Sequence, residues 1–281
     1  MRIAIVAHRA TTTNSALIAA AVPGLDVCLL GPVEAVRELG DGDLALGRLD
    51  VTKSLDGIEL GLWELARLEG AGVRVLNRPS TLIAAHDKLA TARVLDESGI
   101  PHPRTIHVAG AGEPVRLRAP FVVKPRFGSW GRYVVLCREP GELRRCLDDL
   151  AHRPWFQTQG ALVQELVPPQ GEDLRIVVAG GTVVGAIRRV AAPGEWRTNV
   201  ALGARREPVA PSPAACDLAV ASATAIGADL VGVDLLPAPE GGHVVIEVNG
   251  AVESTEQYSL EGDVFERTLR ALTPETVAAV A

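Results

Sequence analysis

The chain has 281 residues, of which 47% are apolar and 22% charged, and its 34 acidic and 28 basic residues give a formal charge of −6. This composition is typical of a soluble globular chain of enzyme size, the length suggests about two domains, and the acidic balance argues against nucleic acid or an anionic membrane surface as a partner. The first apolar run, residues 3–7, is far shorter than the roughly 20 residues of a membrane span, so the sequence predicts a cytoplasmic protein.

Several site types have no matching motif. The four cysteines form no Cys-x-x-Cys pair and the six histidines show no His-x-x-x-His spacing, which argues against a zinc site. The phosphate loop Gly-x-x-x-x-Gly-Lys-[Ser/Thr] and the nucleophile elbow Gly-x-Ser-x-Gly are also absent from the sequence.

Residues 1–80 alternate short apolar runs with helical patterns. Strands are expected at 2–7, 26–30, 44–51 and 73–76, and helices at 14–21, 33–39 and 58–69. This alternation predicts a parallel sheet covered by helices. The domain boundary is expected at Asn77-Arg78-Pro79, where Pro79 can begin a new helix.

The spacing of the apolar residues changes after residue 80. Residues 81–167 are expected to form a small α+β lobe, with helices at 87–97 and 142–152 and strands at 105–108, 121–125, 133–137 and 161–167. Residues 168–281 are expected to form a third unit. Its strands at 174–179 and 182–190 flank the hairpin signal Gly180-Gly181, and helix 214–226, strands 230–236 and 243–249 and helix 264–272 follow.

The last two strands predict an oxygen-rich site. If Asp234 lies opposite Glu247, Asn249 shares their face, because residues two apart lie on one side of a sheet. Oxygen ligands of this kind suit Mg²⁺, and two ions bridged by Glu247 would clamp nucleotide phosphates. The opposite face would be apolar, with Val233, Leu235, Ile246 and Val248. The alternative is the solvent-facing polar side of an edge hairpin.

A second candidate is the connection after strand 121–125. Lys124 precedes Gly128, Ser129, Trp130 and Gly131, and a loop with glycine at both ends can turn backbone N–H groups toward an anion. The alternative is a plain turn. The chain has only three lysines, Lys53, Lys88 and Lys124, among 28 basic residues, which suggests places where a compact ammonium is needed.

Two further groups complete the candidate residues. The segment Gln164, Glu165, Leu166 and Val167 ends a strand where the chain leaves the central lobe, and it can offer backbone groups to an adenine ring and a carboxylate to a ribose; the alternative is a plain hinge. Asp173 and Arg175 share one strand face, and Arg189 points away from Arg188 and Val190. Together with Arg197 and Asn199, these arginines are suited to phosphate or a substrate carboxylate, although surface salt bridges would also explain them.

The order of these motifs resembles the ATP-grasp superfamily, and more narrowly its RimK/LysX-like branch. The resemblance rests on Lys88 at a helix start, Asn77-Arg-Pro, Lys124-Pro-x-x-Gly-Ser-Trp-Gly-Arg132, Gln164-Glu165, Asp173-x-Arg175, Thr198-Asn199 and Glu247-Val-Asn249. It covers the whole chain. It implies an α/β protein with an N-terminal parallel domain (1–80), a central ATP-grasp lobe (81–167) and a C-terminal lobe with an antiparallel sheet (168–281).

The resemblance also implies roles for these residues. Lys88 and Lys124 would contact ATP phosphates, with Lys124 also near the adenine, and the loop with Gly128, Ser129, Trp130 and Gly131 would close over them. Residues Gln164, Glu165, Leu166 and Val167 would hold the base, and Glu165 or Asp173 would lie near the ribose. Asp234, Glu247 and Asn249 would bind two Mg²⁺ ions, or Mn²⁺ in their place. Arg175, Arg189 and Asn199 would face the γ-phosphate and the carboxyl substrate.

The implied reaction is ADP-forming ligation of a carboxylate to an amine through an acyl phosphate. Members similar to LysX join an amino acid to the C-terminal glutamate of a small acidic carrier protein, and an excess of arginine at 188, 189, 197, 205 and 206 would suit such a partner. The alternatives are a RimK- or glutathione-synthetase-like ligase that makes a free peptide or a glutamylated small molecule, and an ATP-binding module without turnover. Gly203-Ala204 and Gly250-Ala-Val-Glu253 depart from the LysX pattern, so the amino acid stays open. A homo-oligomer, dimer or tetramer, is also expected.

Overall fold

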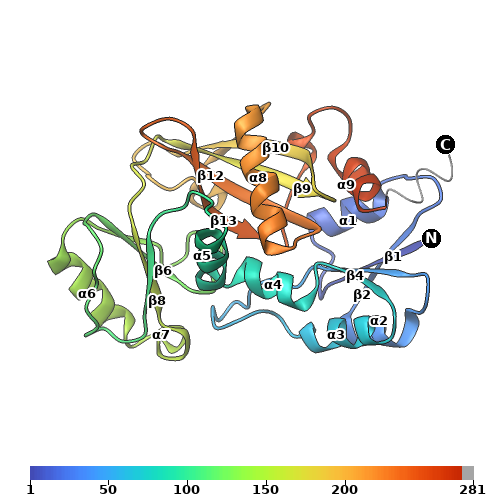
Figure 1. Ribbon diagram of the computed structural model, residues 1–281, viewed down its shortest axis with the longest axis horizontal. Helices are drawn as coiled ribbons and strands as arrows, with labels where there is room; N and C mark the ends of the chain where they lie inside the picture. Colours follow the sequence, from blue (N-terminus) through green and yellow to red (C-terminus); the bar gives the residue numbers. More distant parts are fainter. Residues whose placement is uncertain (274–281) are drawn as a thin grey trace.

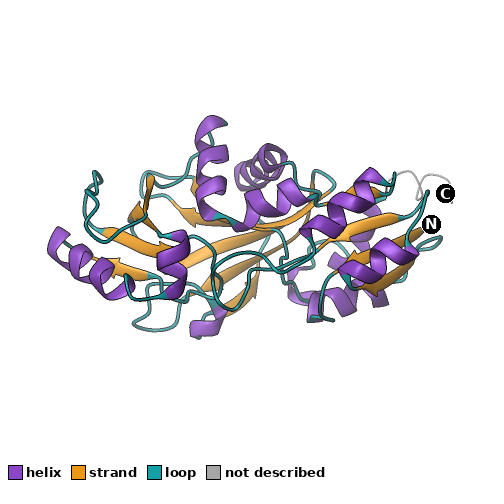
Figure 2. Cartoon of the chain, turned by 90° about the horizontal axis from the view of Figure 1, so that it is seen from below, coloured by secondary structure: helices purple, strands orange, loops and turns teal. Residues whose placement is uncertain are grey.

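The computed structural model describes residues 1–273, in which three β-sheets mark an N-terminal domain, a central lobe and a C-terminal lobe. Figure 1 shows the N-terminal domain in blue at one end, the central lobe in green at the other, and the C-terminal lobe in yellow to red above them. The three parts form an elongated molecule, as Figure 2 shows from below.

The N-terminal domain is built on four parallel strands in the order β2-β1-β3-β4, which confirms the predicted parallel sheet. The strands are β1 (Arg2–Val6), β2 (Asp26–Leu30), β3 (Leu44–Gly47) and β4 (Arg74–Leu76), and the helices are α1 (Thr12–Ala19), α2 (Pro32–Glu38) and α3 (Leu62–Gly70). The chain moves from β1 outward to β2 and then crosses to β3 on the other side of β1. The strand order therefore reverses between β1 and β3.

The segment between β3 and α3 differs from the prediction. The strand expected to reach residue 51 ends at Gly47, and the helix expected from residue 58 begins at Leu62. Between them, Val51 pairs with Ile58 in an isolated antiparallel bridge that closes a loop. At the tip of this loop Leu55, with φ 64°, is buried in the hydrophobic core of the central lobe. The loop therefore connects two domains, which local periodicity does not reveal.

Prolines mark the starts of helices throughout the chain. Helices α2, α4 (Pro79–His86), α6 (Pro140–Leu150), α7 (Pro154–Gln159) and α8 (Pro213–Ile226) each begin with proline. Proline is favourable there because its fixed φ suits the helix and its missing N–H would have no intrahelical partner. The helix expected at Pro79 is thus confirmed. None of the helices in residues 1–273 has both the length and the hydrophobicity to cross a lipid bilayer.

The central lobe is an antiparallel sheet with the order β5-β8-β6-β7. Its strands are β5 (Thr105–Val108), β6 (Phe121–Pro125), β7 (Val135–Cys137) and β8 (Ala161–Glu165). The short helix α7 was not expected from the sequence, because six residues are too few to show a helical period. Its Trp155 and Phe156 are buried in the lobe's core.

The C-terminal lobe contains the largest sheet, with the order β11-β10-β9-β12-β13. The strands are β9 (Glu172–Ala179), β10 (Thr182–Val190), β11 (Arg205–Pro208), β12 (Leu230–Pro237) and β13 (His243–Asn249), and the pairings among them are antiparallel. Strand β11 was not predicted. Single 3-10 turns lie at Val200–Leu202 and Glu256–Tyr258, and α9 (Val264–Leu272) is the last helix of the described residues.

The two faces of this sheet pack against different parts of the molecule. Ile176 and Val233 face a core that includes residues of α8 and Leu95 of α5 (Lys88–Glu97). Val177, on the other face, packs in one core with Ile5 of β1 and residues of α9. The N-terminal domain and the C-terminal lobe therefore share a hydrophobic core, which fixes their relative position.

Asn77 also fastens these two parts together. Asn77 is fully buried, and its backbone φ is 50°. Its side-chain Oδ1 accepts hydrogen bonds from the backbone N–H groups of Asp229 (2.9 Å) and Leu230 (3.0 Å). Its Nδ2 donates to Leu230 O at 2.7 Å and to Gly250 O at 3.3 Å. Leu230 begins β12 and Gly250 follows β13, so the boundary residue predicted from sequence holds the hairpin of Asp234 and Glu247 in place.

Candidate active site

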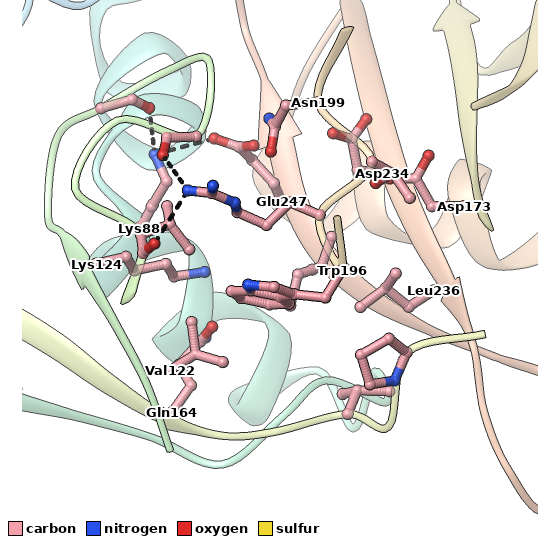
Figure 3. A pocket seen from close by; sticks show the side chains of 18 of the residues that line it. Lys88, Val122, Lys124, Gln164, Asp173, Trp196, Asn199, Asp234, Leu236 and Glu247 are labelled. Carbon is pink, nitrogen blue, oxygen red and sulfur yellow. Dashed lines mark hydrogen bonds and ion pairs between the residues drawn. The ribbon is translucent and has the colours of Figure 1, made fainter. Parts of the chain in front are cut away.

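A cleft lies between the central and C-terminal lobes (Figure 3). Most of the site residues predicted from sequence line it: Lys88, Lys124, Gly128, Ser129, Trp130, Gly131, Gln164, Glu165, Leu166, Val167, Asp173, Arg189, Asn199, Asp234 and Glu247. Arg175 and Asn249 are not among the lining residues, although both lie on the strands that carry the site. Segments that are far apart in the sequence thus meet at one place.

The hairpin of β12 and β13 has the predicted register. Asp234 pairs with Glu247, and Asn249 pairs with Gly232. The prediction was wrong for Ile246, which was expected on the apolar face. A bulge after Asp234 places Val245, not Ile246, opposite Leu235, so Val245 is buried in the core and Ile246 lines the cleft. A bulge inserts one unpaired residue and changes the alternation from that point on.

Lys88 stands in the first turn of α5, where Asp87 caps the helix by accepting from the N–H of Leu89 at 3.1 Å. Its ammonium donates to the carbonyl of Gly128 at 2.6 Å and lies 2.9 Å from Glu247 Oε1. Arg126 holds the same helix start, with Nε 2.7 Å from Asp87 Oδ1. Lys88 therefore links the glycine-rich loop to the carboxylate of β13.

Lys124 is buried on β6, with 6% of its surface exposed. Burial, reinforced by the nearby Lys88 ammonium, lowers the pKa of Lys124 to about 7. Its ammonium makes no hydrogen bond or ion pair with any residue of the described chain. A buried cation without a partner is costly, so an anion entering this cleft would be stabilised at Lys124.

Four buried charges meet beside the hairpin. Arg175 binds Asp234 through two hydrogen bonds of 2.7 Å, and Arg189 donates to Asp234 at 2.9 Å. Arg189 also binds Asp173 through two hydrogen bonds, one of 2.7 Å, and Thr198 donates to the same carboxylate. Burial alone would raise the pKa of Asp234, but the two guanidinium groups lower it to about 2. The network is neutral in sum, which makes its burial tolerable.

The loop of residues 128–131 lies against the segment that carries Asn199. Gly131 has φ 71°, and a Cβ built on it would lie 2.8 Å from Asn199 Oδ1, so both conformation and space require glycine there. Arg197 donates from Nη1 to the carbonyls of Gly131 and Val134, each at 3.2 Å. These contacts hold the glycine-rich loop over the cleft.

The crossover at the end of β8 leaves one backbone donor available. The N–H groups of Glu165 and Leu166 donate to the carbonyls of Arg104 and Pro120, each at 3.0 Å. Within residues 1–273 the N–H of Val167 has no such partner. Gln164 is held by a 2.6 Å hydrogen bond from its Nε2 to Thr105 Oγ1. If a base binds here, Val167 is its main-chain donor.

Several apolar residues that line the cleft were not predicted from the sequence. Figure 3 shows the ring of Trp196 pointing into the cleft, whose lining also includes Val122, Leu236 and Ile246. Flat apolar walls of this kind suit an aromatic base. Trp196 lies in an irregular loop that has no hydrophobic periodicity. The one feature of the sequence that could have indicated its role is its position close to the candidate residues Arg197 and Asn199. Val122 and Leu236 could have been found as neighbours of Lys124 and Asp234 in the strand pattern.

The hairpin carries oxygen atoms of the kind that a hard divalent cation binds, but some of them already have protein partners. Glu247 gives Oε1 to Lys88, while its Oε2 has no partner in the described chain, and the side chain of Asn249 makes no hydrogen bond there although its Nδ2 is buried. Both oxygens of Asp234 are held by arginines. No group of three or more His, Cys, Asp or Glu side chains placed to hold a metal occurs in residues 1–273. A metal here would therefore depend on phosphate oxygens as well as on these side chains.

The comparisons with known proteins agree with this geometry. The model of the RimK-like ATP-grasp domain matches residues 85–268. Glutamate–LysW ligase ArgX from Sulfurisphaera tokodaii is 30% identical over 214 residues, which cover 74% of this chain and 76% of that protein. Alpha-aminoadipate–LysW ligase LysX from the same organism is 35% identical over 190 residues, 66% of each chain.

Among solved structures, the RimK domain ATP-grasp protein of Sphaerobacter thermophilus is similar in fold. It has a TM-score of 0.69 at 24% identity, with 97% of this chain and 99% of that chain covered. The D-alanine–D-alanine ligase of Bacillus anthracis complexed with ATP has the same TM-score at 18% identity, with 99% and 98% covered. The chain therefore belongs to the RimK-like ATP-grasp family and is a carboxylate–amine ligase.

Proposed function

We propose that this ligase joins an amino acid to the C-terminal glutamate of a small acidic carrier protein, with ATP converted to ADP. ATP-grasp ligases use ATP and a divalent metal, and we propose two Mg²⁺ ions, replaceable by Mn²⁺, at Asp234, Glu247 and Asn249. The observation that carries the ligase assignment is the meeting of Lys88, Lys124 and the opposed pair Asp234–Glu247 in one cleft. The carrier is supported by the likeness to the two LysW ligases.

The reaction begins with two anions that repel each other. A carboxylate oxygen of the acceptor attacks the γ-phosphorus of ATP, the bond to ADP breaks, and an acyl phosphate forms. Lys88 and Lys124 would offset the negative charge of the phosphates, and the metal, when bound, would add further screening. Arg175 and Arg189, which hold Asp234 here, are placed at the edge of the same charge cluster.

The second half of the reaction needs an activated carbonyl protected from water. The amine of the amino acid attacks the acyl carbon, the C–N bond forms, phosphate leaves, and the amine proton passes to solvent or phosphate. Premature hydrolysis would waste the acyl phosphate, so the cleft has to stay closed. The contacts of Arg197 with the carbonyls of Gly131 and Val134 favour that closed state.

The arginine excess gives less support to an acidic partner than the sequence suggested. Arg188 pairs with Glu172 and Glu207, Arg197 pairs with Glu195, and Arg205 pairs with Glu207. Arg189 is buried and pairs with Asp173 and Asp234. Only Arg206, among these five, has no carboxylate partner in the described chain. The carrier proposal therefore depends on the relatives and not on this surface.

A second candidate is addition of glutamate to a small molecule or peptide. It is favoured by a probable alpha-L-glutamate ligase of Thioalkalivibrio sulfidiphilus, which is 32% identical over 273 residues and covers 89% of this chain, more than either LysW ligase does.

A location in the cytoplasm and a homo-oligomeric state stay predictions from the sequence.

The test is an intact-mass measurement. The purified ligase is incubated with ATP, Mg²⁺, glutamate or alpha-aminoadipate, and LysW from Sulfurisphaera tokodaii, and ADP is measured in parallel. A mass gain of one amino-acid residue on LysW supports the first proposal. ADP formed from free amino acids with no change in LysW supports the second. Absence of ADP in every mixture, with ATP and metal bound, would contradict both. The Glu247→Gln variant is the control for metal-dependent turnover.

A further inference from the structure

One loop of the N-terminal domain reaches into the central lobe. Residues 51–58 (the strap) run from Val51 to its bridge partner Ile58, and Leu55 lies at the tip. Leu55 is 2% exposed and is buried in the hydrophobic core of the central lobe. The other described residues that are buried in this core lie between 108 and 163, within the central lobe itself. The strap therefore supplies a side chain to a domain other than its own.

Hydrogen bonds within the strap give it a defined shape. The N–H of Thr52 donates to the carbonyl of Gly57 at 2.9 Å. The Asp56 carboxylate accepts from the hydroxyls of Thr52 at 2.7 Å and Ser54 at 2.6 Å. Leu55 has φ 64°, a conformation that is unfavourable for leucine and persists only where surrounding contacts outweigh its cost. Burial of the Leu55 side chain provides those contacts, so the loop is shaped to present this leucine.

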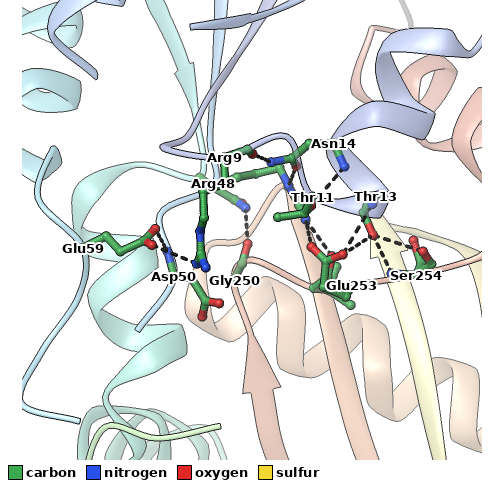
Figure 4. Close-up of polar contacts among 12 residues, drawn as sticks. Arg9, Thr11, Thr13, Asn14, Arg48, Asp50, Glu59, Gly250, Glu253 and Ser254 are labelled. Atoms are coloured by element: carbon green, nitrogen blue, oxygen red, sulfur yellow. Dashed lines mark hydrogen bonds and ion pairs between the residues drawn. The ribbon is translucent and has the colours of Figure 1, made fainter. Parts of the chain in front are cut away.

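The base of the strap is fastened to the C-terminal lobe (Figure 4). Arg48, three residues before the strap, donates from Nη2 to the carbonyl of Val252 at 2.7 Å and from Nε to Asn14 Oδ1 at 2.6 Å. The N–H of Ser254 donates to Thr13 Oγ1 at 2.7 Å. Together with the shared hydrophobic core, these contacts join the N-terminal domain and the C-terminal lobe into one body. The strap extends from that body to the central lobe.

The tip of the strap lies against the glycine-rich loop of the nucleotide cleft. A Cβ built on Gly128 would lie 3.9 Å from Leu55 Cδ2, which is ordinary van der Waals contact. Arg132, just after that loop, donates from Nη1 to the carbonyl of Lys53 at 3.5 Å. Gln159 of the central lobe donates from Nε2 to the carbonyl of the strap residue after Leu55 at 3.0 Å. Polar contacts on both sides of Leu55 thus accompany its burial.

We propose that the strap holds the central lobe in the position that closes the nucleotide cleft, with Leu55 as a positioning residue for the glycine-rich loop. The cleft lies between the central and C-terminal lobes, so opening it moves the central lobe away from the body that carries the strap. This movement withdraws Leu55 from its core and exposes apolar surface to water, which is unfavourable. Burial of Leu55 therefore favours the closed cleft and slows the release of a bound nucleotide. The strap acts in this way whichever carboxylate and amine the ligase joins.

The test measures how fast a bound nucleotide leaves. The fluorescent, non-hydrolysable ATP analogue mant-AMPPNP is bound to the full chain with Mg²⁺ and is displaced by excess ATP in a stopped-flow instrument. Leu55→Ala should release the analogue about tenfold faster than the unsubstituted protein, because less burial is lost when the cleft opens. Leu60→Ala is the matched control: Leu60 is 85% exposed in the same connection between β3 and α3, and its loss should leave the release rate unchanged. Equal rates for Leu55→Ala and Leu60→Ala would overturn the proposal.

Two further substitutions separate the buried side chain from backbone strain. Leu55→Met restores most of the buried volume, so its release rate should lie within about threefold of the unsubstituted protein. Leu55→Gly removes the side chain but adopts φ 64° without strain, so it should release the analogue as fast as Leu55→Ala. A leucine that only stabilised the core would change the unfolding midpoint in urea and leave the release rate as it is. The original release rate in Leu55→Gly would contradict the role of the side chain.

Asp56→Ala keeps the test decisive if the variants at Leu55 do not fold. Asp56 is exposed, and loss of its carboxylate loosens the strap without altering the core, so release should be about threefold faster. Asp43→Ala removes a comparable turn carboxylate, which accepts from the N–H of Gly40 at 3.0 Å, and should not change the rate. Equal rates for these two variants would contradict the strap. Faster release from the strap variants, with no ligation in any mixture, would contradict the proposed function and leave the strap intact.

Discussion

Replacing Arg189 with methionine should destabilise the fold much more than the same change at Arg188, the adjacent residue on the opposite face of β10. Arg189 is 4% exposed and is the arginine that pairs with Asp173, while Asp234 would keep Arg175. Removing one partner of a buried ion pair leaves an uncompensated charge and costs roughly 3–5 kcal/mol. Arg188 is 40% exposed in its side chain and pairs with Glu172 and Glu207, so its loss should cost about 0–1 kcal/mol.

The assay is urea unfolding followed by circular dichroism for both variants and for Asp173→Asn combined with Arg189→Met. Arg189→Met should lower the free energy of unfolding by at least about 2 kcal/mol more than Arg188→Met. In the double variant, Asp173→Asn removes the carboxylate that Arg189→Met leaves unpaired, so it should recover part of the lost free energy of unfolding. Equal unfolding midpoints for the two arginine variants, or no recovery in the double variant, would refute the account of a buried network.

Three further outcomes are expected at the cleft. Glu247→Gln should lower kcat about 100-fold or more with an unchanged circular dichroism spectrum, because the amide is a poor metal ligand; near-normal ADP release would contradict the metal assignment. Lys124 has its pKa lowered from 10.5 to about 7, so at pH values between these two its amine is mostly neutral, and ATP should restore the ammonium on binding. Titrations in two buffers of different ionisation enthalpy at about pH 8.5 should show proton uptake that is lost in Lys124→Met. Gly131→Ala should raise KM for ATP more than Gly194→Ala, because both have positive φ but only an alanine at 131 would meet Asn199, at 2.8 Å; equal effects would contradict that contact.

Local patterns in the sequence were sufficient for much of the fold and for the hairpin of the site. Alternating strands and helices in residues 1–80 predicted the parallel sheet, and the parity of Asp234, Glu247 and Asn249 predicted their register. The bulge could not be predicted, because Val244, Val245 and Ile246 are three consecutive apolar residues that fit either alternation. Hydrophobicity alone does not say which of them leaves the core.

The interactions between domains could not be predicted from the sequence, for a different reason. Arg48 and Glu253 are 205 residues apart, and Leu55 is buried in a lobe whose first strand begins 50 residues later. Nothing in the neighbourhood of either residue marks its partner, because such pairs are selected by packing of finished domains and not by local propensity. Asn77 is intermediate: its position before Pro79 predicted a boundary, but the hydrogen bonds to Leu230 and Gly250 depend on where β12 and β13 come to rest.

This difference bears on how the hairpin of the candidate site is held. The cleft lies between the central and C-terminal lobes, but Asn77, which follows the last strand of the N-terminal sheet, binds both the start of β12 and the residue after β13. The position of Asp234 and Glu247 therefore depends on a residue of the N-terminal domain. Since misplacement of a reacting group by about 1 Å can reduce a rate about 100-fold, a hairpin fixed in this way suits a ligase.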